Sequence, residues 1–405
     1  MKPIVRAGRM KPVHSDIRGP LFVEAMKRQK QGIDILKLNT GNPATFGFGL
    51  PDSIKNALME HMQDGVGYCD FKGMPQARQA ICDYETSKGI KGITPDDVFI
   101  GNGVSEVVSF ALTPLLNDED EVLVPSPSYS LWGNSVYLED GKPVFYTCDE
   151  QANWYPDIQD IRSKITDKTK AIVIINPNNP TGVLYPKELL LEIIQIARES
   201  GLLIFADEIY DRLVMDGKQH ISLASLTEDV PVITLNGLSK SHCLCGYRCG
   251  WMVISGPREL TEDYRQGIIQ LTSLRLCANT MAQIVIPAAL DDMETPASMV
   301  RPGGRIYEQR EATVRELEKI DGLSFVKNDA AFYVFPKLDV KKFNITNDKQ
   351  FAHDLLDATN ILLVPGSGFD WKDPDHFRIV MLPQADVLSD AIRRMGTFLD
   401  GYKQK

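Results

Sequence analysis

Several features that would place this chain in a membrane or secreted class are missing from its sequence. No stretch approaches the roughly 18 consecutive apolar residues that a membrane-crossing helix needs. The first twenty residues are rich in lysine and arginine but lack the apolar core of a signal peptide. The sequence therefore predicts a cytoplasmic protein.

Dense basic runs and a disulfide framework are missing as well. The formal net charge is −10 at pH 7, which argues against a surface that binds nucleic acid or an anionic membrane. The seven cysteines are odd in number and irregularly spaced, which favours reduced thiols. Residues 242–249 combine one histidine with three cysteines but lack the paired C-x-x-C motifs of a structural zinc site. We therefore expect no metal.

The length of the chain and its ordinary composition indicate two folded domains. At 405 residues it exceeds the size that one hydrophobic core usually supports. Apolar residues make up 43% of it and charged residues 24%, so each domain can bury a core. We predict an amino-terminal arm with part of a small domain over residues 1–45, a large domain over 46–290, and a small α+β domain over 291–405.

The middle of the chain alternates short apolar runs with amphipathic stretches, which is typical of a parallel sheet covered by helices. One such stretch, 187–200, has helical spacing and is followed by Gly201, a common helix stop. The fold class is therefore α/β, with a short strand at 332–335 in the smaller domain. The strands predicted in the large domain are 98–100, 121–124, 171–175, 202–206, 232–235 and 251–254.

A lysine follows one of these strands at the edge of the sheet where open α/β folds bind ligands. Residues 236–240 read NGLSK, so Lys240 lies just beyond the strand 232–235. Desolvation would lower the pKa of this lysine and favour the free amine that forms a Schiff base with an aldehyde. Taken alone, the motif fits an exposed loop lysine better.

Two neighbouring motifs change that interpretation. Arg248, in GYRCG at residues 246–250, follows the lysine closely and can clamp a phosphate bidentately. Asp207, in DEIY at 207–210, places a carboxylate at the carboxyl end of the strand 202–206. A lysine, an arginine and a carboxylate are therefore expected in one cleft.

Two further turns point to the same cleft. Residues 176–182, NPNNPTG, follow the strand 171–175. Residues 101–106, GNGVSE, lie before an apolar helical run, and the N-terminus of such a helix binds phosphate. The second turn lacks the G-x-G-x-x-G pattern, which disfavours a dinucleotide-binding fold.

Together these motifs resemble the fold-type I, class I and II aminotransferases, which depend on pyridoxal 5'-phosphate (PLP). The resemblance runs from about residue 15 to the end of the chain and implies a large domain with a mostly parallel, seven-stranded sheet. It implies that Lys240 carries the cofactor and moves the substrate proton. It also implies that Asp207 keeps the pyridine nitrogen protonated.

The resemblance assigns roles to further residues. Gly41, Asn179 and Arg378 would bind the substrate carboxylate, with Arg378 gripping it bidentately. Tyr68 would reach the phosphate of a neighbouring subunit, which implies a homodimer with shared active sites. The other cofactor-binding positions are Val104, Ser105, Tyr129, Asn179, Tyr210, Ser239 and Arg248.

The stretches 16–20, 41–48 and 301–310 resemble bacterial glutamate–pyruvate (alanine) aminotransferases. This implies amino transfer between L-alanine and 2-oxoglutarate by ping-pong chemistry. A glutamate side chain needs a second cation. We hypothesise that Arg18 supplies it, with Arg275 in reserve.

Other functions stay open at this point. On the same fold, the chain could be an aromatic or branched-chain aminotransferase or a carbon–sulfur β-lyase. A non-enzymatic PLP-domain regulator should carry a fused DNA-binding segment, and a nucleotide-binding module would leave Lys240 and Asp207 without a role. Cys243 and Cys249 depart from the small or aliphatic residues usual in the family, which puts the detail of the pocket in doubt.

Overall fold

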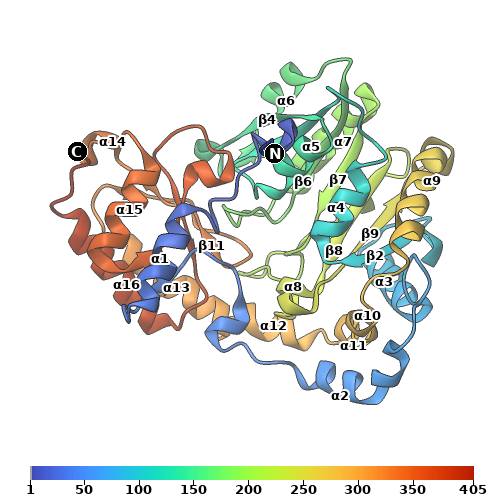
Figure 1. The fold of residues 1–405 in the computed structure, drawn as a ribbon, viewed down its shortest axis with the longest axis horizontal. Helices are drawn as coiled ribbons and strands as arrows, with labels where there is room; N and C mark the ends of the chain where they lie inside the picture. The colour runs from blue at the N-terminus through green and yellow to red at the C-terminus, as the bar shows by residue number, and fades with distance from the viewer. Residues whose placement is uncertain (1) are drawn as a thin grey trace.

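A computed structural model describes residues 2–405, and an eight-stranded sheet lies at its centre. The strand order is β2-β9-β8-β7-β6-β3-β4-β5. Helices cover both faces of this sheet (Figure 1). The strands are Val98–Asn102 (β2), Glu121–Ser126 (β3), Lys142–Asp149 (β4), Tyr155–Pro156 (β5), Thr169–Ile175 (β6), Leu203–Asp207 (β7), Val232–Gly237 (β8) and Cys249–Ser255 (β9).

The sheet is mostly parallel, as the sequence predicted, but it has one strand more than the expected seven. β4, β3, β6, β7 and β8 run parallel to one another. β9 is antiparallel to both β8 and β2, and the extra strand, β5, is a two-residue edge strand antiparallel to β4. Two residues carry too little pattern for a strand to be recognised from sequence.

Alternate residues of the central strand β6 enter two different apolar cores, because successive side chains of a strand point to opposite faces. Ile172 and Ile174 pack in one core with Ile193 of helix α7 (Lys187–Ser200). Val173 packs in the other core. The helix has the predicted bounds and ends at Gly201 in the left-handed conformation.

The remaining helices of this half range from the four residues of α8 to the 18 residues of α9. They are α2 (Asp52–His61), α3 (Pro75–Ser87), α4 (Val104–Leu112), α5 (Leu131–Leu138), α6 (Ile158–Lys164), α8 (Leu238–Ser241), α9 (Arg258–Arg275), α10 (Thr280–Ile284) and α11 (Ile286–Asp291). No single helix within residues 2–405 is long and apolar enough to cross a membrane. The pair α9 and α10–α11 passes that test only jointly, by length and composition, and is bent by 119° at its break.

The carboxyl-terminal third of the sequence packs with the start of the chain. α1 lies beside α15 (Figure 1). β1 pairs in parallel with β13, so the segment after the arm joins the carboxyl-terminal part. The elements are α1 (Pro20–Lys30), β1 (Leu36–Lys37), α12 (Glu294–Val300), α13 (Arg305–Leu317), β10 (Leu323–Ser324), β11 (Tyr333–Val334), β12 (Lys337–Leu338), α14 (Val340–Phe343), α15 (Asp348–Thr359), β13 (Ile361–Leu362), β14 (Val364–Pro365), β15 (Phe377–Val380) and α16 (Ala385–Leu399).

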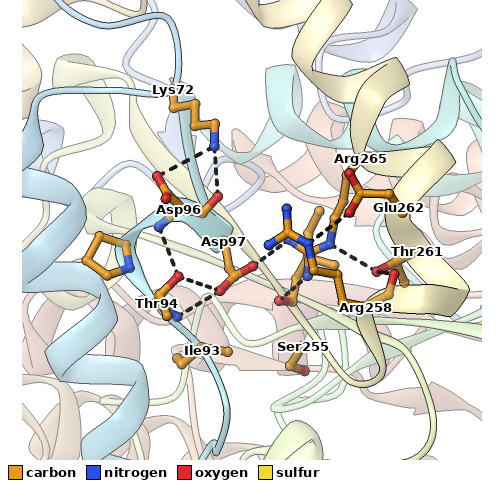
Figure 2. A network of polar contacts seen from close by, with 12 residues as sticks. Lys72, Ile93, Thr94, Asp96, Asp97, Ser255, Arg258, Thr261, Glu262 and Arg265 are labelled. Carbon is orange, nitrogen blue, oxygen red and sulfur yellow. Dashed lines mark hydrogen bonds and ion pairs between the residues drawn. The ribbon is translucent and has the colours of Figure 1, made fainter.

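A buried ion pair fixes the β2–β9 edge of the large sheet (Figure 2). Arg265 of α9 donates to Asp97 Oδ1 at 2.6 Å and to the carbonyl of Ile254 in β9 at 3.0 Å. Asp97 directly precedes β2 and accepts hydrogen bonds from the backbone and the hydroxyl of Thr94. The pair therefore ties one helix to two strands.

Candidate functional site

Lys240 lies in the short helix α8, directly after the end of β8. Its Nζ donates a hydrogen bond to the carbonyl of Gly41 at 3.0 Å. The same nitrogen lies 5.7 Å from the centre of the Phe332 ring. The amine is thus held at the carboxyl edge of the sheet between two loops from distant parts of the chain.

The pKa of Lys240 differs from the sequence-based expectation. Burial lowers this pKa, but Tyr333, Cys245 and Tyr129 raise it, and the balance lies above the ordinary value for lysine. The expected lowering is therefore wrong for this side chain, because groups brought in from other loops outweigh desolvation.

Asp207 ends β7 and is buried. Trp132 donates through Nε1 to its Oδ2 at 3.0 Å. Burial raises the pKa of Asp207 to about 6, while Trp132 and Lys240 act to lower it. At neutral pH Asp207 is therefore mainly an ionised carboxylate in the protein interior. The positive charge of Lys240 is close enough to lower the pKa of this carboxylate.

Arg378 extends from β15 and is also buried. It donates to Asn179 Oδ1 at 2.9 Å and to the carbonyl of Asn39, and its guanidinium stacks 4.5 Å from the Tyr333 ring and 4.6 Å from the Phe369 ring. Its buried Nε has no hydrogen-bond partner within residues 2–405. Burial lowers the pKa of Arg378, yet the group stays cationic because arginine titrates so far above neutral pH. Such a cation fits an anionic ligand.

Aromatic hydroxyls line the space between these groups. Tyr210 donates to the hydroxyl of Tyr333 at 3.0 Å. A side chain at Gly41 would collide with that same Tyr333 hydroxyl, so only glycine permits this approach of the loop. Tyr129 is half-buried and lies near enough to both Lys240 and Arg378 to raise the pKa of each.

A second cationic corner lies at the N-terminus of α4, whose first residues are Val104 and Ser105. The preceding Gly103 has a φ of +85°, and a side chain there would collide with the guanidinium of Arg248. The exposed Arg248 donates to the carbonyl of Cys245 at 3.0 Å. The guanidinium and the helix N-terminus together favour an anion.

The two remaining predicted cofactor-binding residues are Ser239, which lies next to Lys240, and Tyr68, which is exposed. Ser239 directly precedes Lys240 in α8 and is half-buried. Tyr68 is 83% exposed within one chain. Other exposed apolar side chains from the segments 59–66 and 274–276 are Met59, Met62, Val66, Leu274 and Leu276.

The two candidate cations for a glutamate side chain differ in how they are engaged. Arg275 pairs with Glu106 at 2.5 Å and donates to the carbonyls of Phe71 and Ile100. Arg18 is exposed in the arm. Arg275 is therefore already committed to contacts within the large sheet region.

The arm around Arg18 is connected to the site. The carbonyl of Ile17 accepts a hydrogen bond from Asn39 at 2.8 Å, and the carbonyl of Asn39 in turn accepts from Arg378. His14 holds the arm further along by contacting Asp370 at 3.0 Å. Arg18 is thus one residue away from a chain of contacts that ends at Arg378.

Several residues that support the site from distant elements were not predicted from the sequence, chiefly Trp132, Tyr333 and Asn39. Trp132 lies in α5 and contacts Asp207, and Tyr333 lies in β11 and contacts Tyr210. No local pattern marks either of them. Asn39 lies two residues before Gly41, so its place next to the predicted loop could be inferred from the sequence.

A cluster that resembles a metal site lies beneath Asp207. Within residues 2–405, Glu208, Asp211 and His220 form the group of His, Cys, Asp or Glu side chains whose ligand atoms could meet on one ion. Lys88 Nζ lies 2.8 Å from Glu208 and 3.2 Å from Asp211. A protein ammonium therefore pairs with these carboxylates.

Comparison with known proteins agrees with this geometry. The family model described as "Aminotransferase class I and II" matches residues 33–394. The glutamate-pyruvate aminotransferase AlaA of Haemophilus influenzae is 50% identical over the whole of both chains. The crystal structure of an aminotransferase from Escherichia coli is 47% identical and superimposes over both full chains with a TM-score of 0.98. An alanine aminotransferase from Pyrococcus furiosus is 40% identical, with a TM-score of 0.93 over 98% of this chain and all of the other. The chain therefore belongs to the class I and II aminotransferases.

Proposed function

We propose that this aminotransferase moves an amino group between L-alanine and 2-oxoglutarate, with pyruvate and L-glutamate as the other pair. The observation that carries the proposal is the convergence of Lys240, Asp207 and the partly unpaired Arg378 at one edge of the sheet. The names of the relatives from Haemophilus influenzae and Pyrococcus furiosus support the choice of substrates.

Membership of the family implies dependence on PLP, and the residues present fit that cofactor. When bound, PLP supplies an electron sink for the bond that breaks at the substrate Cα. Asp207 is a buried carboxylate suited to a protonated ring nitrogen. Arg248 and the N-terminus of α4, with Val104 and Ser105, offer donors for the phosphate.

The remaining cofactor contacts are proposals of the same kind. Ser239 is placed beside Lys240 to add a phosphate donor. Asn179 and Tyr210 offer hydrogen-bond donors for a ring oxygen, and Tyr129 offers a flat ring for stacking. Lys240 Nζ would hold the cofactor covalently.

The protein then has two tasks. Arg378 binds the substrate α-carboxylate bidentately and so fixes the direction of the Cα–H bond. Lys240 Nζ removes the proton from Cα and later returns it, which is general base and general acid catalysis by one group. Because one amino acid must leave as a keto acid before the second substrate enters, ping-pong kinetics are expected.

The test is the half-reaction of the holoenzyme with single amino acids. Alanine, glutamate, phenylalanine and leucine are mixed separately with the enzyme, and the spectral conversion of the cofactor is followed. Fast conversion by alanine and glutamate supports the proposal. Faster conversion by phenylalanine or leucine would show that the proposed substrates are wrong. If none of the four amino acids converts the cofactor, a carbon–sulfur lyase would be favoured.

We further propose that Arg18 binds the side-chain carboxylate of glutamate and 2-oxoglutarate. It is exposed, and its arm contacts Asn39, which supports Arg378. Arg18→Ala should raise the KM for glutamate and 2-oxoglutarate at least tenfold, because a charged hydrogen-bonded pair contributes about 1.5 to 3 kcal/mol, and should leave the KM for alanine nearly unchanged. Arg9→Ala, in the same arm, is the control. Equal loss for all substrates would remove this role.

The oligomer and the location remain predictions from sequence. Tyr68 is proposed to reach the phosphate site of a partner subunit in a homodimer with shared active sites, which its exposure in one chain supports. A cytoplasmic location likewise stays a prediction.

A further inference from the structure

A single ammonium group faces three carboxylates beneath the proposed site. Lys88 follows α3, and its Nζ lies 2.6 Å from Glu85, 2.8 Å from Glu208 and 3.2 Å from Asp211. The carboxylate side chains are at most 3% exposed and that of Lys88 is 12% exposed. In such a place each charge depends on the others for compensation.

Lys88 is a protonated ammonium at neutral pH in this cluster. Burial lowers its pKa, but Glu208, Glu85 and Asp211 raise it well above the ordinary value for lysine. Burial also raises the pKa of Glu85 to about 7, with Lys88 acting to lower it. The ammonium therefore favours the ionised form of the carboxyl groups that face it inside the protein.

Two partners of Lys88 belong to the turn that carries the proposed cofactor residues. Glu208 directly follows Asp207, and Asp211 directly follows Tyr210. Asp211 also accepts a hydrogen bond from Asn236 Nδ2 at 2.7 Å, at the end of β8 and just before Lys240. One ammonium thus connects the turn after β7 with the turn after β8.

The same cluster reaches the loop that carries Asn179. His220 donates through Nε2 to the carbonyl of Asn176 at 3.1 Å, and this nitrogen lies 3.9 Å from Glu208. Glu208 also accepts from the hydroxyl of Ser222 at 2.9 Å. Because Nε2 carries its proton toward a carbonyl, His220 acts here as a donor that links Asn176 to the cluster.

A third connection runs to β9. Trp251 donates through Nε1 to Glu85 at 3.2 Å. Arg248, the proposed phosphate ligand, lies just before the start of this strand. The turns after β6, β7 and β8 and the strand β9 are therefore each connected to Lys88 through a short chain of contacts.

We propose that Lys88 is a positioning residue of the aminotransferase site, which holds the loops of Asp207, Asn179 and Lys240 in their mutual register. The inference rests on the proposed roles of those three residues. Without the ammonium, three carboxylates would repel one another, and the turns that carry them would separate. A displacement of about 1 Å in a catalytic group can lower turnover roughly a hundredfold.

The experiment compares Lys88→Met with Lys91→Met as holoenzymes. Lys91 is a matched control, because it lies on the same segment, is 70% exposed and pairs only with Glu228 at the surface. We expect Lys88→Met to lose kcat by roughly ten- to a hundredfold with little change in the KM for alanine, to release PLP faster on dilution, and to show a shifted visible spectrum. Lys91→Met should match the parent protein in all three.

Lys88→Met could fail to fold because it strands three buried carboxylates, so a charge-balanced variant accompanies it. Lys88→Met combined with Glu208→Gln removes one charge of each sign and keeps an amide oxygen for Ser222. We expect this variant to regain the urea midpoint but to keep the low kcat and the fast release of PLP. Parent-like kcat and PLP retention in either variant would overturn the proposal and leave Lys88 with a stabilising role only.

The outcome can be separated from a failure of the proposed function. Release of PLP and the visible spectrum need no alanine activity. If the parent protein retains PLP but does not convert alanine, the proposed substrates are wrong while the comparison of PLP release still tests Lys88.

Discussion

At the scale of single residues, the pKa of Asp207 lies within the pH range over which binding of PLP can be measured. Burial raises its pKa to about 6, so the carboxyl becomes protonated as the pH falls through that value. A neutral carboxyl cannot pair with a protonated ring nitrogen. We therefore expect the affinity of the cofactor-free protein for PLP to fall below pH 6, by up to about tenfold per pH unit, in titrations followed by visible absorbance.

Asp207→Asn provides the control, since PLP itself also titrates. This variant should bind PLP weakly and lack the part of the pH dependence that belongs to the carboxyl group. Protonation of Asp207 does not unfold the protein at low pH, so unfolding cannot account for the loss of PLP. A carboxyl group whose pKa is raised in the folded state stabilises the folded protein at low pH, and this contribution is lost as the pH rises through 6. An unchanged pH profile in Asp207→Asn would refute the assignment.

The candidate site was predictable from sequence where a motif follows a strand. Lys240, Asp207 and Asn179 all lie at carboxyl ends of adjacent strands, and this edge is set by the α/β topology. Contacts between distant elements were not predictable. Trp132 and Lys88 act on the turn after β7 from helices whose sequences give no sign of it.

At the scale of secondary-structure elements, the buried pair of Asp97 and Arg265 predicts a specific loss of stability. Asp97→Asn leaves a buried guanidinium without its carboxylate, which typically costs about 3 to 5 kcal/mol. We expect a clearly lower urea midpoint for unfolding, measured at one fixed protein concentration.

The matched control lies on the same helix (Figure 2). Glu262 pairs with Arg258 in an exposed i,i+4 contact, with side chains 48% and 65% exposed. Because exposed pairs contribute little, Glu262→Gln should leave the midpoint nearly unchanged. Equal effects of Asp97→Asn and Glu262→Gln on the urea midpoint would show that burial does not determine how much the Asp97–Arg265 pair stabilises the protein.

Strands were recognised from sequence where both faces are buried. β3 and β7 are buried at every position, and their apolar runs are interrupted only by polar residues at their ends. β4 was missed because its burial alternates irregularly, with exposed ends at Lys142 and Asp149. The antiparallel direction of β9 was missed too, since direction depends on the path of the connection and not on the residues of the strand.

At the scale of the whole molecule, the exposed apolar side chains around Tyr68 predict a second copy of the chain. Val66 is 77% and Leu274 is 83% exposed. We expect a dimer in sedimentation experiments and a loss of both dimer and PLP retention in Val66→Asp, because a buried charge at an interface is costly and Tyr68 would lose its partner.

Leu260→Asp serves as the control for this prediction. Leu260 is 63% exposed on the same helix as Leu274, roughly 20 Å away along the helix axis. It should leave the dimer intact. A parent protein that sediments as a fully active monomer would exclude shared active sites.

The pairing of β1 with β13 has a consequence for synthesis on the ribosome. Leu36 emerges early, but its partner Ile361 is made near the end of the chain. At about 5 to 20 residues per second, the first strand waits on the order of tens of seconds for its neighbour. During that interval the large sheet can form, while the edge of β1 stays open to chaperones. The nascent protein therefore pairs β1 with β13 only after most of the large sheet has been synthesised.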